Sequence, residues 1–303
     1  MKIPEYYPYR SSEAKEIYLA AADRAAGRWP VAAETRMVRT AYGETFVRIS
    51  GPERAQPLVI LPGMTTSSLF WAPNIEALST AYRTYAVDRI GDVGRSTCTR
   101  RMTRVCHLVG WLDELFSGLG LGDEINLMGL SYGGWLAALY ALHFPKRLRR
   151  MVLLAPGGTV LRTRVEFLLR GALFLTGRRS FANSAVHWLA EDLAREDPER
   201  VAAWVDRSLL TLRCIRPRLP VAPTVFTDRQ LRNLRVPALF LVGEHEKIYS
   251  AARAVRRLTR VAPQIRTEIV RQAGHDLTIV QAEKVNRKIL EFLRGDGTSG
   301  AAG

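Results

Sequence analysis

The sequence predicts an α/β protein, in which a mostly parallel sheet is flanked by helices and carries one helical insertion. Short, unbroken apolar runs recur along the chain and alternate with stretches of helical pattern. Such runs are typical of strands that are buried on both faces, and their alternation with helices indicates a parallel sheet covered on both sides. Between Pro156 and Leu234 the alternation stops, and this stretch is helical in pattern without a convincing strand.

The elements of this sheet can be placed in order along the chain. A hairpin is expected first, at residues 36–40 and 45–49. The following strands are expected at residues 58–61, 84–87, 125–128, 151–154, 238–242 and 265–270. The connecting helices are expected at residues 69–80, 103–119, 132–144, 251–261 and 278–293. Residues 35–156 and 236–294 are therefore expected to form the core of the fold.

Three further segments lie outside that core. Residues 1–34 are expected to form a helical extension, because Ser11 and Ser12 can cap a helix in an Ala- and Glu-rich stretch. Residues 157–235 are expected to form a helical cap, or lid, over the carboxyl edge of the sheet, where α/β folds bind ligands. A separate helical packing domain is the alternative. Residues 295–303 are of low complexity and are expected to form a disordered tail.

The chain carries a large excess of positive charge. Of its 44 basic residues 38 are arginine, against 29 acidic residues, which gives a formal net charge of +15 and a pI near 10.3. A nucleic acid or an anionic membrane partner would explain such an excess. The basic residues are scattered on separate elements, however, and form no long block with interleaved aromatic residues. We therefore expect a solvated, Arg-rich surface and no nucleic-acid partner.

Cysteine content and hydropathy indicate the compartment. Cys98, Cys106 and Cys214 form no CxxC pair and no zinc-binding pattern, and an odd, sparse count is typical of a reducing environment. The N-terminal MKIPEYYPYR has no apolar run of the kind that a secretory signal needs. The most apolar window, residues 165–176, contains Arg170 and is too short to span a bilayer. We expect a cytoplasmic protein with no membrane span, no metal and no cofactor.

The strongest local signal is the run Gly129-Leu130-Ser131-Tyr132-Gly133, which lies directly between a predicted strand and a predicted helix. A serine in this context occupies a sharp, strained turn with its hydroxyl exposed. Gly129 and Gly133 are expected there because a Cβ at either position would collide with the turn. Ser131 also lies at a helix N-terminus, where the helix dipole favours developing negative charge. We therefore predict that Ser131 is a nucleophile.

A serine nucleophile needs a base that removes its proton. His275 follows the last predicted strand, so it is expected on a loop at the same edge of the sheet as Ser131. By contrast, His107, His143 and His187 lie in or at the end of helical patterns and are expected to be packing or surface residues. His275 is therefore the predicted base.

The base needs a carboxylate that fixes its tautomer and stabilises the imidazolium. The predicted strand at residues 238–242 is followed by a loop that contains Glu244 and Glu246, and this loop is expected to lie beside His275. Glu246 is the predicted acid and Glu244 the alternative. The chain order of serine, acid and histidine is that of one hydrolase fold and differs from the order in the two serine-protease folds.

A tetrahedral intermediate needs two donors for its oxyanion. The backbone N–H of Tyr132, directly after the nucleophile, is one predicted donor. The loop after the strand at residues 58–61 is expected to supply the other, and Met64 N–H is the natural candidate because Gly63 permits the bend that aims it inward.

Together, the serine turn, the oxyanion loop, the late acid, the late histidine and the inserted cap resemble the α/β-hydrolase superfamily of serine hydrolases. The resemblance covers residues 35–294 and is greatest to bacterial carboxylesterase-like members with a helical cap. The segment VDRIGDVGRS is similar to the D-x-x-G-x-G-x-S loop of that family, with Asp92 shifting the spacing, and Asp88 is expected to be a structural hydrogen-bond acceptor there. The chain departs from the family pattern at Pro62, where His is usual, and at Glu246, where Asp is usual.

The resemblance and the triad predict hydrolysis of carboxylic esters or thioesters through an acyl-enzyme on Ser131. The expected partner is a small ester with an apolar acyl or alcohol group, because the cap is rich in apolar residues; Phe70, Trp71, Phe167 and Trp188 are candidates for its pocket. Hydrolysis of lactones or carbon–carbon bonds and cofactor-free peroxidation on the same triad are the alternatives. A further alternative is a non-catalytic binding protein that kept the fold.

Overall fold

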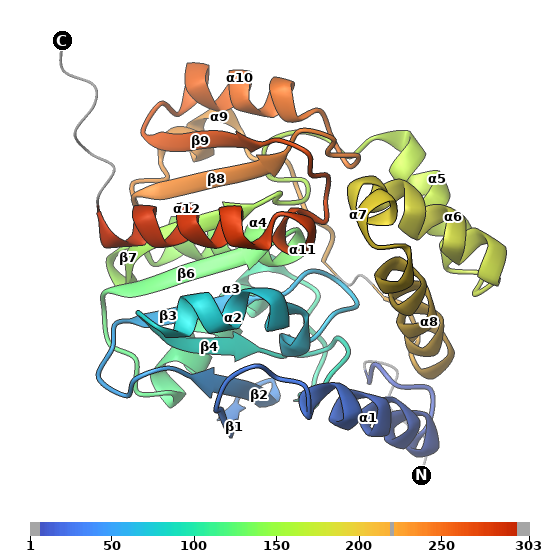
Figure 1. Ribbon diagram of the computed structural model, residues 1–303. Helices are drawn as coiled ribbons and strands as arrows, with labels where there is room; N and C mark the ends of the chain where they lie inside the picture. The colour runs from blue at the N-terminus through green and yellow to red at the C-terminus, as the bar shows by residue number, and fades with distance from the viewer. Residues whose placement is uncertain (1–6, 219–220, 296–303) are drawn as a thin grey trace.

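A computed structural model describes residues 7–218 and 221–295 of the chain (Figure 1). The strands are β1 (Glu34–Thr40), β2 (Gly43–Ser50), β3 (Pro57–Leu61), β4 (Arg83–Val87), β5 (Thr97–Cys98), β6 (Ile125–Leu130), β7 (Leu148–Leu154), β8 (Ala238–Gly243) and β9 (Ile265–Val270). The α-helices are α1 (Ser12–Ala26), α2 (Ala72–Ser79), α3 (Val105–Gly118), α4 (Tyr132–His143), α5 (Val165–Phe174), α6 (Arg179–Leu189), α7 (Glu191–Glu196), α8 (Pro198–Cys214), α9 (Asp228–Arg232), α10 (Ala251–Val261), α11 (Leu277–Val280) and α12 (Ala282–Arg294). The short 3-10 helices are η1 (Ser68–Trp71) and η2 (Pro145–Arg147).

The strands form one mostly parallel sheet. Within the described residues the order is β1-β2-β4-β3-β6-β7-β8-β9, with β5 paired to β2. β2 runs antiparallel to both β1 and β4, whereas every other neighbouring pair from β4 to β9 is parallel. The α/β class and the predicted strands and helices of the sheet are thus confirmed. β5 is the one strand of the sheet that the sequence pattern does not predict, because two residues are too short to show an alternation.

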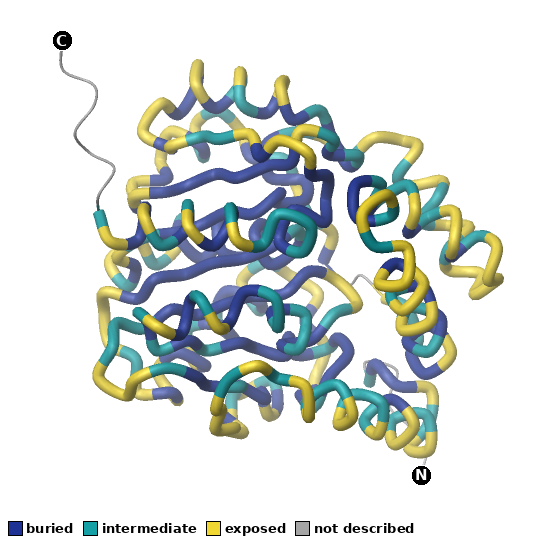
Figure 2. Tube along the Cα trace, in the orientation of Figure 1, coloured by how far each residue is buried: buried dark blue, intermediate teal, exposed yellow. Residues whose placement is uncertain are grey.

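Different helices cover the two faces of the sheet, which explains the unbroken apolar runs. Leu58 and Ile60 of β3 belong to a buried cluster with residues of α2 and α12. Val59 and Leu61, the alternate residues of the same strand, belong to the main cluster with residues of α3, α4 and α10. Successive side chains of a strand point to opposite faces, so both faces of β3 are buried and a run without polar residues results (Figure 2).

Helices α5 to α8 lie beside the carboxyl ends of the parallel strands (Figure 1). α5 has no buried residue, and much of its surface and that of α6 is open to solvent (Figure 2). α9 packs against α10 instead: Leu231 is fully buried in the main cluster, and Arg257 of α10 pairs with Asp228 at a distance of 2.6 Å. The segment that lies over the sheet edge is therefore shorter than the range 157–235 expected from the helical pattern.

The N-terminal segment contains the expected helix. Ser11 caps α1 by accepting a hydrogen bond of 2.9 Å from the backbone N–H of Ala14. Tyr9 and Tyr18 are buried in a cluster with Cys214 at the end of α8, so α1 packs against the last helix of the cap. Most of the predicted tail, 296–303, and residues 1–6 lie outside the described residues. No helix in the described part of the chain is long and apolar enough to cross a membrane.

Candidate active site

Ser131 lies between β6 and α4, at the edge of the sheet where the parallel strands end. Its backbone has φ 54° and ψ −115°, a conformation that costs a residue other than glycine about 1–3 kcal/mol. Hydrogen bonds hold this strained backbone in place: its N–H donates to the Leu154 carbonyl at 2.9 Å, and its own carbonyl accepts from Gly157 N–H at 3.0 Å. The serine therefore occupies a sharp strand-to-helix turn that neighbouring strands support.

Close backbone packing explains the two glycines of this turn. A Cβ on Gly129 would collide with the backbone of Gly133. A Cβ on Gly133 would collide with the carbonyls of Leu61 and Pro62 at the end of β3. The start of α4 thus lies directly against the end of β3, and only glycine fits between them.

His275 and Glu246 meet across two neighbouring strands. Glu246 follows β8 and His275 follows β9, and Nδ1 of His275 lies 2.9 Å from Oε2 of Glu246. The other carboxylate oxygen accepts the backbone N–H of Ile248 at 2.8 Å. Both side chains are buried, with 8% of His275 and 4% of Glu246 exposed. Because the ionised carboxylate accepts the proton of Nδ1, Nε2 is left as the ring nitrogen that can act as a base.

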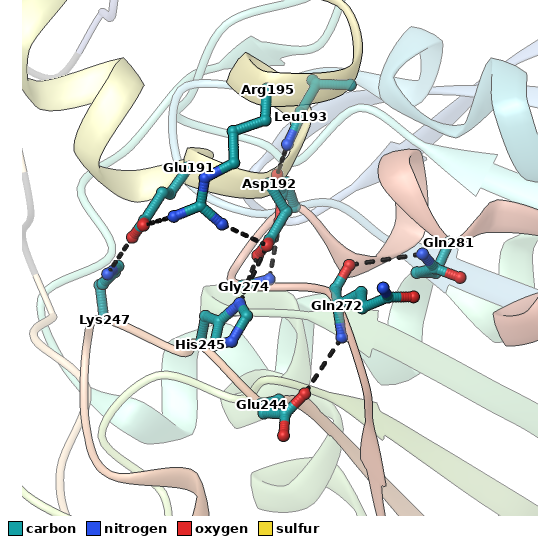
Figure 3. A network of polar contacts seen from close by, with 11 residues as sticks. Glu191, Asp192, Leu193, Arg195, Glu244, His245, Lys247, Gln272, Gly274 and Gln281 are labelled. Atoms are coloured by element: carbon teal, nitrogen blue, oxygen red, sulfur yellow. Dashed lines mark hydrogen bonds and ion pairs between the residues drawn. The ribbon is translucent and has the colours of Figure 1, made fainter.

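The alternative acid points elsewhere. Glu244 is exposed and accepts the backbone N–H of Gln272 at 3.2 Å (Figure 3). Among the described residues there is no hydrogen bond between the Ser131 hydroxyl and His275. Glu246 and His275 are therefore hydrogen-bonded to each other, whereas the Ser131 hydroxyl makes no hydrogen bond to His275. A long or missing contact of this kind is common in enzymes without bound substrate.

The surroundings of His275 favour its charged form. Burial lowers the pKa of the imidazole, but the charge and hydrogen bond of Glu246, together with the nearby charge of Asp276, outweigh burial and raise the pKa above 6.5. Asp276 is itself fully buried, and burial raises the pKa of its carboxyl group. The histidine is thus set up to hold a proton that it has taken from another group.

Two backbone donors near Ser131 are free. The N–H groups of Met64 and Tyr132 donate no hydrogen bond to any described residue. The loop that carries Met64 lies close to Ser131, because a Cβ placed on Gly63 would lie 3.6 Å from Ser131 Cβ. Both predicted oxyanion donors therefore belong to segments that adjoin the serine.

A buried ion pair supports these two segments. The Asp92 carboxylate accepts the backbone N–H of Thr65 at 3.0 Å and pairs with Arg89. The guanidinium group of Arg89 in turn lies 4.3 Å from the centre of the Tyr132 ring, a cation–π contact. The pair connects the residue after Met64 with the residue after the nucleophile. In the sequence Asp92 stands out only as an extra residue in the loop, so this role has no sequence signal.

Asp88 has the structural role that was expected for it. Its carboxylate accepts the backbone N–H groups of Ser68 at 2.7 Å and Arg95 at 2.8 Å. Only 2% of the residue is exposed, and burial raises its pKa while these hydrogen bonds oppose the rise. Asp88 therefore ties the loop after β4 to η1 and is not an acid of the triad.

The cap helix α7 binds the loop that carries Glu246 (Figure 3). Both oxygens of Asp192 lie near Nδ1 of His245, at 2.9 and 3.0 Å, and Asp192 is 5% exposed. Glu191 pairs with Lys247. The residues on either side of Glu246 are thus both held by α7.

The same helix binds the loop that carries His275. The carboxylate of Asp276 accepts the backbone N–H of Leu193 at 3.0 Å and that of Gly274 at 2.9 Å. Neither Asp192 nor Asp276 is predicted from the sequence as part of the site. Asp276 is adjacent to the predicted base, which is the only signal that points to it, whereas Asp192 is distant in sequence from both loops.

A cavity of about 230 Å³ lies between α1, α8 and the loop that leads into η1. Phe70, a predicted pocket residue, lines it, and its ring centre is 6.5 Å from that of Trp204 on α8. Trp71 was also expected to line a pocket, but the structure places it in the core, where it is fully buried in a cluster with residues of α2. The lining includes neither Ser131 nor His275, but it includes Thr65 and Thr66 of the loop that carries Met64.

Phe167 and Trp188, the other two predicted pocket residues, lie on α5 and α6 and do not line this cavity. Their ring centres are 6.5 Å apart. Phe167 packs against the main cluster of the core, and Arg170 stacks on the indole of Trp188 at 4.9 Å. Both side chains are therefore used in packing the cap.

Comparison with known proteins adds independent evidence. Carboxylesterase YbfK from Bacillus subtilis is 35% identical over 284 residues, which cover 92% of this chain and 94% of YbfK. A second Bacillus subtilis protein, described as the uncharacterized carboxylesterase nap, is 35% identical over 274 residues. The match covers 88% of this chain and 89% of that protein. The crystal structure of naproxen esterase (carboxylesterase NP) from the same organism superposes with a TM-score of 0.85 at 32% identity, over 93% of this chain and 99% of that one.

The family assignment follows from a match over most of the chain. Residues 58–288 match the family model described as "Alpha/beta hydrolase family". This range contains the serine turn, the acid loop and the histidine described above. The chain therefore belongs to the alpha/beta hydrolase family.

Proposed function

We propose that this protein is a serine carboxylesterase that cleaves small esters through an acyl-enzyme on Ser131. The observation that carries the proposal is the buried pair of His275 and Glu246, at 2.9 Å, on loops that leave the same sheet edge as the strained serine. The carboxylesterase relatives, which are similar to the chain over most of its length, support ester hydrolysis in particular.

The reaction follows from the groups at the site. His275 takes the Ser131 proton through Nε2 as Oγ attacks the ester carbonyl. The free N–H groups of Met64 and Tyr132 stabilise the oxyanion, and Glu246 remains ionised and stabilises the imidazolium. His275 then protonates the leaving alcohol and activates the water that cleaves the acyl-enzyme.

The proposed setting is the cytoplasm, and the proposed partner is a small ester with no nucleic acid involved. Cys98, Cys106 and Cys214 are all free thiols, as is usual in a reducing compartment. The cavity beside the oxyanion loop is lined mainly by apolar groups, and such a pocket is suited to a small organic substrate.

Replacement of the nucleophile tests the proposal. Ser131→Ala is expected to lower kcat for 4-nitrophenyl butyrate by at least about 10⁴-fold, because the acyl-enzyme cannot form. A fluorophosphonate is expected to label Ser131 once per chain, as measured by peptide mass spectrometry. Ser180→Ala, an exposed serine at the start of α6, is the matched control and is expected to keep full activity. Wild-type turnover that survives in Ser131→Ala would contradict the proposal.

A further inference from the structure

The cavity beside the oxyanion loop has three walls of different character. One face of α8 forms the first wall, with Arg200, Trp204, Arg207 and Thr211 at intervals of three or four residues. The opposite wall is α1, which presents small side chains such as Ala22. α1 and α8 lie side by side in Figure 1.

The third wall leads to the nucleophile. Thr65 and Thr66, which belong to the loop that also carries Met64, line the cavity together with Phe70 of η1. A point at the Cβ position of Gly63 lies 3.9 Å from Thr66 Oγ1 and 3.6 Å from Ser131 Cβ. Thr66, which lines the cavity, therefore lies near Ser131.

Two arginines in this cavity have no acidic partner. The side chains of Arg200 and Arg207 form no ion pair and no hydrogen bond with any described residue, and no described residue of the lining is acidic. Some arginines of α5 to α8 are paired: Arg170 with Glu166 at 3.1 Å, and Arg179 with Asp206 at 2.7 Å. Among the described residues, Arg200 and Arg207 differ from the other unpaired arginines of these helices, Arg178 and Arg213, in that both line the cavity.

The local field at this wall is positive. Arg200 and Arg207 are both exposed by area. The atoms around the head group of Arg207 nevertheless desolvate it and lower its pKa; Tyr18 opposes this lowering, and the charge of Arg200 adds to it to a smaller extent. An arginine remains charged at any physiological pH even so. Arg200 and Arg207 are thus two like charges without a counterion in a partly enclosed space. An anion that binds between them would stabilise both charges.

We propose that this cavity is a carboxylate subsite, and that the enzyme prefers esters with a second, free carboxylate group, which Arg200 and Arg207 bind. Such a substrate extends from Ser131 past Thr66 into the cavity, and its apolar part contacts Phe70 and Trp204, which line the cavity together with the two arginines. Arginine suits this role because its planar head group donates two parallel hydrogen bonds to a carboxylate. The inference rests on the proposed ester hydrolysis and specifies its substrate class.

Matched substrates separate charge from size. The first series consists of the monoethyl esters of linear dicarboxylic acids from succinate to suberate, and it places the carboxylate on the acyl side. The second consists of O-acetyl ω-hydroxyalkanoates and places it on the alcohol side. Each acid is compared with its ω-amide, which has the same shape and no charge. We expect kcat/KM to favour the acid over the amide by about tenfold or more at one chain length in one series.

Variants then assign the preference to the two arginines. Arg200→Gln and Arg207→Gln are each expected to lower kcat/KM about five- to tenfold for the preferred acid and less than twofold for its amide. Arg213→Gln removes the same charge from the same helix outside the cavity and is expected to change neither value. Higher ionic strength is expected to weaken the preference of the wild type, because salt screens exposed charges.

A binding measurement keeps this inference separate from the proposed hydrolysis. Calorimetric titration of the Ser131→Ala protein with acids of both series and their amides is expected to show tighter binding of the acid in one series, and loss of that difference in the Ser131→Ala/Arg207→Gln protein. Failure of the wild type to cleave any ester would overturn the proposed function and leave this difference measurable. Equal binding of acid and amide, or equal effects of Arg207→Gln and Arg213→Gln, would overturn the carboxylate subsite.

Discussion

The buried carboxylate of Glu246 is the proposed acid, and it is hydrogen-bonded to the proposed base, His275. It has two acceptor oxygens, and each has a donor: Nδ1 of His275 at 2.9 Å and the backbone N–H of Ile248 at 2.8 Å. A glutamine has the same shape but only one acceptor oxygen, so it cannot satisfy both donors. In the Glu246→Gln protein the amide NH₂ group therefore faces either Nδ1–H of His275 or the backbone N–H of Ile248, and two donors oppose each other in a buried site.

Glu246→Gln is therefore expected to lower kcat/KM for esters by about 10³-fold, since the imidazolium loses its counter-charge and the ring its preferred tautomer. Glu244→Gln, the same change on the exposed neighbour, is expected to stay within twofold of wild type. Steady-state kinetics with 4-nitrophenyl butyrate measure both variants. If the two variants lose activity equally, Glu246 is not the acid.

The pH profile supplies a second readout of the same prediction. The base must be neutral, so kcat/KM is expected to rise with pH through the pKa of His275, and in the wild type that midpoint lies above 6.5 because Glu246 raises it. In Glu246→Gln the raising charge is gone while burial, which lowers the pKa, remains. The midpoint is expected to move to lower pH, and an unchanged midpoint would contradict this account of the site.

At the scale of elements, α7 is the connection between the cap and the candidate triad. Asp192 holds His245 and Glu191 holds Lys247, on either side of Glu246, while Leu193 donates to Asp276 beside the base (Figure 3). These contacts are buried or partly buried, unlike most ion pairs of the cap surface. One short helix, α7, therefore links α5, α6 and α8 to the two loops that carry Glu246 and His275.

Asp192→Ala is expected to loosen this connection. The loss of a buried charge-assisted contact costs about 1–3 kcal/mol, so amide hydrogen exchange is expected to speed up in α5 to α7 and in the loops after β8 and β9. Asp206→Ala, which removes an exposed ion pair with Arg179 on the outer side of the cap, is the matched control and is expected to leave exchange in those loops unchanged. Exchange that increases in the cap alone would mean that α7 does not order the loops.

At the scale of the whole molecule, the elements that have a strong local sequence pattern could be predicted from the sequence. β3 and β8 are apolar throughout because both of their faces are buried, and a run of this kind is visible in the sequence without any knowledge of neighbours. Ser131 and its glycines were predictable for a similar reason, since the turn depends on adjacent residues. The candidate serine, acid and histidine were predicted by applying the chemistry of one reaction to the ends of predicted strands, and the structure brings the acid and the histidine into contact.

What could not be predicted depends on contacts between distant segments. Asp192 reaches His245, and Asp92 reaches Thr65, only after the chain has folded. The helical pattern of α9 is like that of its neighbours, so the sequence does not show that α9 packs against α10 and the main cluster. The position of Trp71 could not be predicted for the same reason. The sequence pattern is the same whether a large apolar residue at this position faces a pocket or the core, and in the structure Trp71 is buried in the core.

The N-terminal segment joins the end of the cap to the core and so affects the stability of the whole molecule. Arg10 N–H donates to the Cys214 carbonyl at 2.9 Å, at the end of α8. The hydroxyl of Tyr9, which is fully buried, donates to the Gly94 carbonyl at 2.7 Å and accepts the Gly94 N–H at 3.0 Å. One tyrosine thereby satisfies both polar groups of a buried residue in the loop after β4.

Tyr9→Phe is expected to lower the free energy of unfolding by about 1–3 kcal/mol, because it leaves the N–H and carbonyl of Gly94 buried without a partner. Tyr7→Phe removes a hydroxyl that has no hydrogen bond to the described residues, and it is expected to change stability by less than about 0.5 kcal/mol. Urea unfolding followed by circular dichroism measures both. A single transition with a lower midpoint and an unchanged slope in Tyr9→Phe indicates that the N-terminal segment, the cap and the core unfold together. A separate early transition would show instead that α1 and α8 detach from a core that stays folded, and Tyr9 would then stabilise only that junction.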